Sequence, residues 1–78
     1  MKHISVEVSD DLAARLDELA NLCTQADRAR DHAATHGALK ASDLLAMLAE
    51  DASMVITRPG SWEGMNMKNV LDSHGYQF

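Results

Sequence analysis

The predicted fold depends on one stretch near the N-terminus, Ile4-Ser5-Val6-Glu7-Val8-Ser9-Asp10-Asp11-Leu12. Its first half alternates β-branched with polar residues, which is the pattern of a strand with one buried face. Its second half places Ser9 where it can cap a helix that carries two carboxylates in its first turn. A single strand is not stable in water, and the chain offers no second one. We therefore expect residues 4–8 to pair with the same strand of a second copy.

Three helices are predicted after this stretch. In the first, the apolar residues recur at the spacing of one helix face: Leu12, Leu16, Leu19 and Cys23. We expect it to continue to about His36, because nothing breaks the helix before Gly37. The second begins with Ser42 and Asp43 and ends before a turn at residues 57–60. The third covers about residues 66–74 and ends at Gly75, with residues 61–64 irregular before it.

The composition predicts a thin hydrophobic core. Of the 78 residues, 36 are apolar, but 12 of these are alanine and only three are aromatic. A chain of this size buries only about 60% of the surface that it exposes when unfolded, so its core is marginal without a partner. Oligomerisation or docking on another protein is the expected remedy.

Charge and cysteine content exclude several classes of protein. The net charge is −5, so binding of nucleic acid by charge alone is not expected. The single cysteine, Cys23, excludes an internal disulfide framework and fits a reducing compartment. No apolar run is long enough to span a membrane, and the N-terminus lacks the apolar segment of a secretory signal. We expect a cytoplasmic protein.

No motif indicates an enzyme or a cofactor. His32 and His36 have the spacing at which two imidazoles on a helix can share a metal, but no third ligand lies nearby in the sequence. Exposed histidines are therefore favoured over a metal site. The sequence contains no glycine-rich phosphate loop, no nucleophile elbow and no Cys-x-x-Cys pair. We expect a non-enzymatic protein without metal or cofactor.

Two stretches, residues 3–20 and 37–50, resemble the ribbon-helix-helix proteins of the Arc/MetJ type. The resemblance implies a mostly α fold with one N-terminal β-strand, in which two chains form a dimer. Relative to that family, the first helix is lengthened by about residues 24–35, and a short C-terminal helix is added. In the family, two strands form an antiparallel ribbon that enters the DNA major groove, and the start of the second helix binds a phosphate.

Carried over to this chain, the resemblance gives two sets of residues. Operator DNA would be bound by His3, Ser5, Lys40 and Ser42. The homodimer would be formed through Ile4, Val6, Val8, Leu44 and Leu48.

The C-terminal part lies outside the DNA-binding core of that family. We expect residues 1–56 to form the dimerisation domain and residues 57–78 to form a partner-binding tail, as in antitoxins whose C-terminal tails wrap a toxin. Trp and Arg are favoured anchors at protein interfaces. The expected partner-binding residues are Arg58, Trp62, Met67, Leu71, Tyr76 and Phe78. An equally weighted alternative for Trp62 is that it covers the small hydrophobic core.

The leading hypothesis is therefore a small regulator of the antitoxin or autorepressor kind, which binds operator DNA as a dimer and a protein through its tail. The alternative is a small acidic inhibitor, similar to an anti-CRISPR protein, that blocks a nucleic-acid-binding complex. In that case Glu7 and the net charge of −5 favour binding to a basic partner. A structural assembly module, with helices packed through alanine, is a third possibility.

Overall fold

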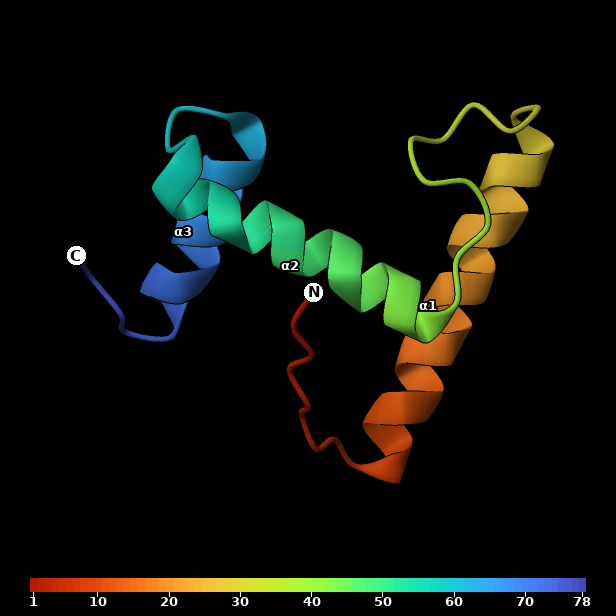
Figure 1. The fold of residues 1–78 in the computed structure, drawn as a ribbon, viewed down its shortest axis with the longest axis horizontal. Helices are drawn as coiled ribbons and strands as arrows, with labels where there is room; N and C mark the ends of the chain where they lie inside the picture. Colours follow the sequence, from red (N-terminus) through yellow and green to blue (C-terminus); the bar gives the residue numbers. More distant parts are fainter. The chain divides into compact units, whose positions relative to one another are not determined.

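The computed structural model describes residues 1–78 and contains three α-helices (Figure 1). They are α1 (Asp10–Ala29), α2 (Ala41–Thr57) and α3 (Trp62–Ser73). The chain divides into two compact units, Met1–Leu44 and Leu45–Phe78, with the division inside α2. Each unit is described by itself.

The predicted N-terminal strand is wrong, because residues 1–9 form no regular secondary structure. The fold is all-α rather than mostly α with one strand, and it provides no ribbon. The alternating pattern identifies a segment that can be extended, but a strand also needs a hydrogen-bonded neighbour. The chain contains no second strand to supply one, and Ile4 and Val6 are exposed.

Helix α1 begins as predicted, with Ser9 as its N-cap. The Ser9 hydroxyl accepts a hydrogen bond from the Leu12 N–H at 3.1 Å, and Asp10 and Asp11 occupy the first turn. The cap satisfies one of the N–H groups that a helix start leaves without a partner. Of the strand and the helix that we expected from residues 4–12, this stretch therefore forms only the start of the helix.

Helix α1 ends at Ala29, so its predicted continuation to His36 is wrong. The His32 N–H donates to the Asp27 carbonyl at 2.7 Å, and the Asp31 N–H donates to the Arg28 carbonyl at 3.3 Å. This pair of bonds is the Schellman closure of a helix, which usually has glycine at the position that Asp31 occupies. Asp31 and His32 instead adopt positive φ angles of 53° and 60°.

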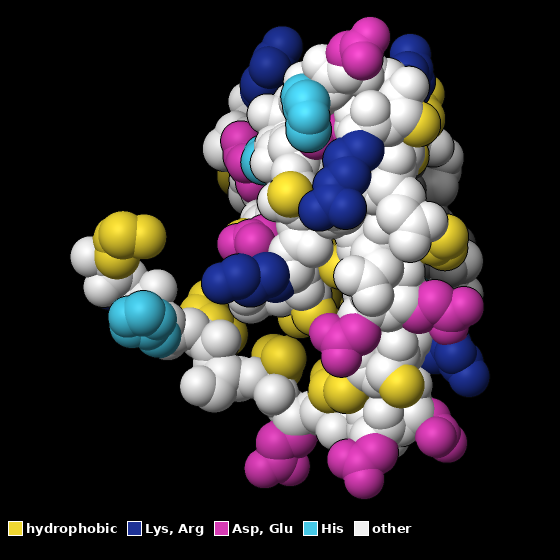
Figure 2. Space-filling model, turned by 90° about the vertical axis from the view of Figure 1, so that its right-hand side faces the viewer, with side chains coloured by type: hydrophobic (Ala, Val, Ile, Leu, Met, Phe, Trp, Pro, Cys, Tyr) yellow, Lys and Arg dark blue, Asp and Glu magenta, His cyan; other side chains and the backbone are white.

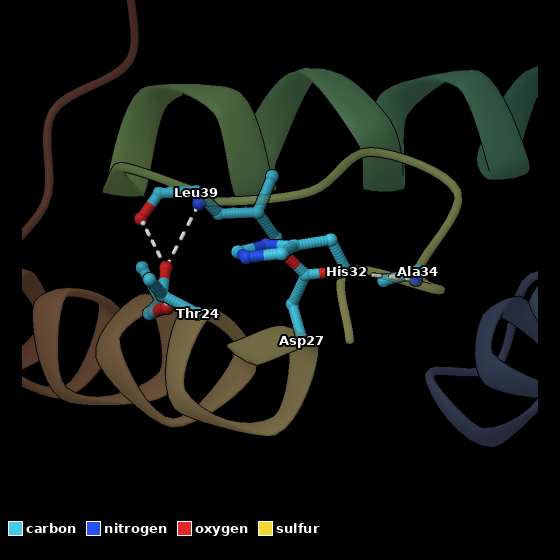
Figure 3. A network of polar contacts seen from close by, with 6 residues as sticks. Thr24, Asp27, His32, Ala34 and Leu39 are labelled. Carbon is cyan, nitrogen blue, oxygen red and sulfur yellow. Dashed lines mark hydrogen bonds and ion pairs between the residues drawn. The ribbon is translucent and has the colours of Figure 1, made fainter. Parts of the chain in front are cut away.

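The Asp27 carboxylate holds the segment that follows α1 (Figure 3). One oxygen accepts from the Ala34 N–H at 3.1 Å, and the other lies 3.1 Å from Nδ1 of His32. Asp27 is only 3% exposed, although the His32 side chain is largely in solvent. A buried carboxylate needs such partners to offset its lost hydration. This side chain therefore adds two polar contacts to the backbone hydrogen bonds that close the turn.

A second polar contact returns the chain to α1 (Figure 3). The Thr24 hydroxyl accepts from the Leu39 N–H at 2.9 Å, and its oxygen lies 3.2 Å from the Leu39 carbonyl. Helix α2 then begins at Ala41, one residue before the predicted Ser42. Asp43 lies inside the first turn of α2 and not at its N-cap position. Its carboxylate accepts a hydrogen bond from the N–H of Lys40, the residue before the helix, at 3.0 Å.

Replacing Asp31 by glycine is expected to stabilise the first unit. Glycine adopts positive φ without steric cost, and removal of a carboxylate from the end of a helix also removes an unfavourable interaction with its dipole. We expect Asp31→Gly to raise the free energy of unfolding by about 0.5–1 kcal/mol in urea denaturation. The control is Asp17→Gly, inside α1, which should lower it by about 0.3 kcal/mol, the difference in helix propensity between aspartate and glycine. A loss of stability in Asp31→Gly would contradict the proposed closure.

Candidate partner-binding surface

Helix α3 begins at Trp62 because Ser61 caps it. The Ser61 hydroxyl accepts from the Gly64 N–H at 3.0 Å and donates to the Arg58 carbonyl at 2.7 Å. It therefore joins the start of α3 to the turn that ends α2. The prediction that residues 61–64 are irregular and that the helix starts near Asn66 is wrong.

Gly64 allows α3 to lie directly against the end of α2. A Cβ atom at this position would lie 2.6 Å from the Arg58 carbonyl oxygen and 2.8 Å from the Met54 carbonyl oxygen. Both distances are too short for a carbon atom, so only glycine fits without a shift of the backbone. The close packing of the second unit therefore depends on a residue that has no side chain.

The end of α3 confirms the predicted cap at Gly75. Gly75 has a φ of 92°, and its N–H donates to the Asp72 carbonyl at 2.9 Å. The Tyr76 N–H donates to the Leu71 carbonyl at 3.0 Å, which completes a Schellman motif. This closure turns the last three residues back from the helix axis.

The returning C-terminal segment places Phe78 beside Lys68. The Lys68 ammonium lies 4.4 Å from the centre of the Phe78 ring, a distance at which a cation and an aromatic face attract each other. The same ammonium forms an ion pair with Asp72, one turn further along α3. Lys68 thus connects the helix surface to the end of the chain.

These elements enclose a groove in the second unit, which we call the α2–α3 groove. Its volume is about 440 Å³, within the range of sites that bind ligands or large side chains. Its apolar lining residues are Val55, Pro59, Met65 and Phe78. Gly64, Lys68 and Asn69 complete it. The groove therefore has apolar walls and two polar side chains.

Large apolar side chains of the second unit are exposed, and two of them, Met65 and Phe78, line the groove. Trp62 is 76% exposed and Phe78 is 75% exposed, and Met65 is also in solvent. The only hydrophobic residues that the whole chain buries are Ala20 and Leu44. Contiguous exposed apolar patches are typical of sites that interact with other molecules.

The predicted partner-binding residues differ in exposure and in their relation to the groove. Four are exposed, namely Arg58, Trp62, Tyr76 and Phe78, whereas Met67 and Leu71 are half-buried. Of the six, only Phe78 lines the groove. No contact within the structure tests their role, so the assignment stays a prediction.

The predicted DNA-binding and dimerisation residues come from the irregular N-terminal segment and from residues 40–48, at the start of α2. His3 and Ser5 lie in the irregular N-terminal segment, and the Lys40 N–H, at the position where the resemblance implies a phosphate contact, donates to the Asp43 carboxylate. Among the remaining residues of these two sets, Leu44 is buried and Leu48 is half-buried. The others are exposed: Ile4, Val6, Val8 and Ser42. These roles also stay predictions.

Two further features concern metals and membranes. His32 and His36 do not share a helix, and no group of three or more His, Cys, Asp or Glu side chains is arranged to hold a metal ion. None of the three helices combines the length and the apolar composition that crossing a bilayer requires.

Sequence reasoning missed Met65, Lys68 and Asn69 as residues of the groove. The signal that would have found them is Ser61, which follows the Pro59-Gly60 turn and is a favoured N-cap residue. A helix that starts at Trp62 places Met65 and Asn69, three and seven residues later, on the same helix face as Trp62.

Comparisons with protein-family models, with curated proteins and with solved structures found no match.

Gly64→Ala is expected to destabilise the second unit, although alanine is the better helix former by about 1 kcal/mol. The added methyl group must displace two backbone carbonyls, so we expect a net loss of about 1–3 kcal/mol in urea denaturation followed by circular dichroism. The matched control is Gly60→Ala, where a Cβ atom meets nothing within 4 Å. Equal stability of the two variants would contradict the close packing at Gly64.

Proposed function

We propose that this chain is a small non-enzymatic regulator, similar in action to an antitoxin, which binds a partner protein through its second unit. The observation that carries the proposal is the exposure of Trp62, Met65 and Phe78 in the second unit, where Met65 and Phe78 also line the α2–α3 groove. Trp is among the residues that contribute most to protein interfaces, and Met adapts its shape to a partner. The single cysteine fits action in the cytoplasm.

We also propose that the chain forms a homodimer and binds operator DNA. Their support is the resemblance of residues 3–20 and 37–50 to ribbon-helix-helix proteins. Because the fold has no ribbon, protein binding is the part of the function that we place first.

The test is co-expression with the product of the adjacent gene, followed by purification and native mass spectrometry. The variant Trp62→Ala removes an exposed side chain, so it should leave the fold intact but weaken the complex by about 30-fold, the effect of losing an interface anchor worth about 2 kcal/mol. Leu19→Ala, which removes an exposed side chain of α1, is the control and should bind as the natural chain does. Equal binding by both variants would contradict a role for the second unit.

A second candidate function is favoured by the first unit. The residues before and within the first half of α1 carry five carboxylates, and Figure 2 shows acidic side chains gathered where this helix begins. The acidic residues are Glu7, Asp10, Asp11, Asp17 and Glu18, among which Arg15 is the only cation and pairs with Glu18. The surface would suit an inhibitor that occupies the basic channel of a nucleic-acid-binding complex.

Salt dependence distinguishes the two candidates. A complex formed through the apolar groove should lose less than about tenfold in affinity between low and physiological salt, whereas one formed through five carboxylates should weaken far more steeply. Isothermal titration of the purified complex at several salt concentrations measures this. A steep loss together with normal binding by Trp62→Ala would favour the acidic inhibitor.

A further inference from the structure

Helix α1 carries an apolar stripe that the first unit covers only in part, and we call this stripe the α1 seam. Its residues are spaced alternately four and three apart along the helix: Leu12, Leu16, Leu19, Cys23 and Ala26. Leu16 and Cys23 are half-buried, and the other three are exposed. The average spacing of 3.5 residues is that of the positions that meet in a two-stranded coiled coil. The seam can therefore pack lengthwise against another helix.

The contacts of the first unit lie on a neighbouring face of α1. The segment between α1 and α2 is held there by the side chains of Thr24 and Asp27, which accept hydrogen bonds from its backbone. Beside that face, Leu12 and Leu19 on the seam remain 46% and 44% exposed, and Leu22 is exposed as well. The unit therefore leaves a row of leucines on its longest helix without a partner.

The sizes of the side chains along the seam point to a second copy of the chain as its occupant. Leu12 and Leu16 make the first half of the seam bulky, whereas Cys23 and Ala26 make its second half small. When two such helices run antiparallel, each bulky half faces a small half, so the two axes keep one separation along the whole contact. In a parallel pair the two small halves would face each other and leave a gap.

The distribution of charge along α1 favours the same orientation. Residues 7–18 contain five carboxylates and one cation, whereas residues 19–31 contain two of each. A parallel pair would bring the two acidic halves together. An antiparallel pair places each acidic half against the half that contains Arg28 and Arg30, neither of which forms an ion pair within the chain. It also aligns the two helix dipoles favourably.

We propose that two copies of this chain form a symmetric dimer by packing their α1 seams together in antiparallel orientation. The proposal deepens the homodimer of the proposed function and rests on it. In the register that matches the seam positions, Leu12 of one copy faces Cys23 of the other, and Leu16 faces Leu19. The two-fold axis makes the contact reciprocal and closed, so it forms a dimer and not a filament.

Sedimentation equilibrium of the full chain measures the dimer. We expect a dissociation constant on the order of 10 µM, because a seam of about two heptads is smaller than a standard protein interface. Leu19→Ala removes a leucine from both sides of the contact and should weaken the dimer by more than about tenfold. Alanine favours the helix, so circular dichroism should show the helix content of the natural chain. The control is Asn21→Ala, an exposed position of α1 outside the seam, which should dimerise as the natural chain does.

Disulfide cross-linking with diamide tests the orientation. Leu12→Cys places a new thiol opposite Cys23 of the other copy, so this variant should form a covalent dimer. The double variant Leu12→Cys/Cys23→Ser removes the opposing thiol and should not. The natural chain should also resist cross-linking, because the two Cys23 thiols are about 16 Å apart along the helix axis in the antiparallel pair. Efficient cross-linking of the natural chain would overturn this orientation.

The remaining outcomes separate this inference from the proposed function. A dimer that Leu19→Ala leaves unchanged and Val6→Ser dissociates would overturn the seam and leave the homodimer standing. A chain that is monomeric at about 30 times the expected dissociation constant would overturn both. Binding of the partner protein through the second unit is read independently by Trp62→Ala. If the free chain is monomeric and Leu19→Ala weakens the partner complex, the partner covers the seam and this inference fails.

Discussion

A shortage of buried apolar side chains governs this structure. Ala20 and Leu44 are the only hydrophobic residues that the chain buries, and alanine removes little area from water. Folding must still offset the conformational entropy of 78 residues. The large side chains that would normally do so, among them Trp62 and Phe78, remain on the surface. The same shortage that leaves the free chain with little core therefore leaves large apolar side chains exposed, which is the feature that supports the proposed binding of a partner.

With little core, the elements are fixed by local polar closures. Ser9 and Ser61 cap the starts of α1 and α3, and Schellman bonds close the ends of the same two helices. In the first unit, the Asp27 carboxylate holds the segment after α1 through hydrogen bonds. In the second unit, Gly64 lets α3 pack closely against the end of α2, because it has no side chain. Each of these caps and turns requires one backbone geometry, so it sets the direction in which the chain enters or leaves the helix. They are what brings Lys68 and Phe78 to one groove.

Local signals of the sequence predicted the parts of the fold that depend on local chemistry. The cap at Ser9, the second helix and the stop at Gly75 agree with the structure. The strand was wrong because alternation does not supply a hydrogen-bonded neighbour, and the end of α1 was missed because an aspartate, Asp31, stands where glycine is usual. The groove could not be predicted, since it needs the start of α3 at Trp62 and the return of Phe78 to Lys68, and both are tertiary features.

The free chain leaves large apolar side chains of the second unit exposed, and its only tryptophan, Trp62, is one of them. The most direct measurement is the fluorescence of Trp62 in the isolated chain, with quenching by acrylamide. We expect emission close to that of tryptophan in water and quenching nearly as efficient as for the free amino acid, independent of protein concentration. Blue-shifted emission that acrylamide barely quenches, in the isolated chain at high dilution, would show that Trp62 is buried and would contradict the account.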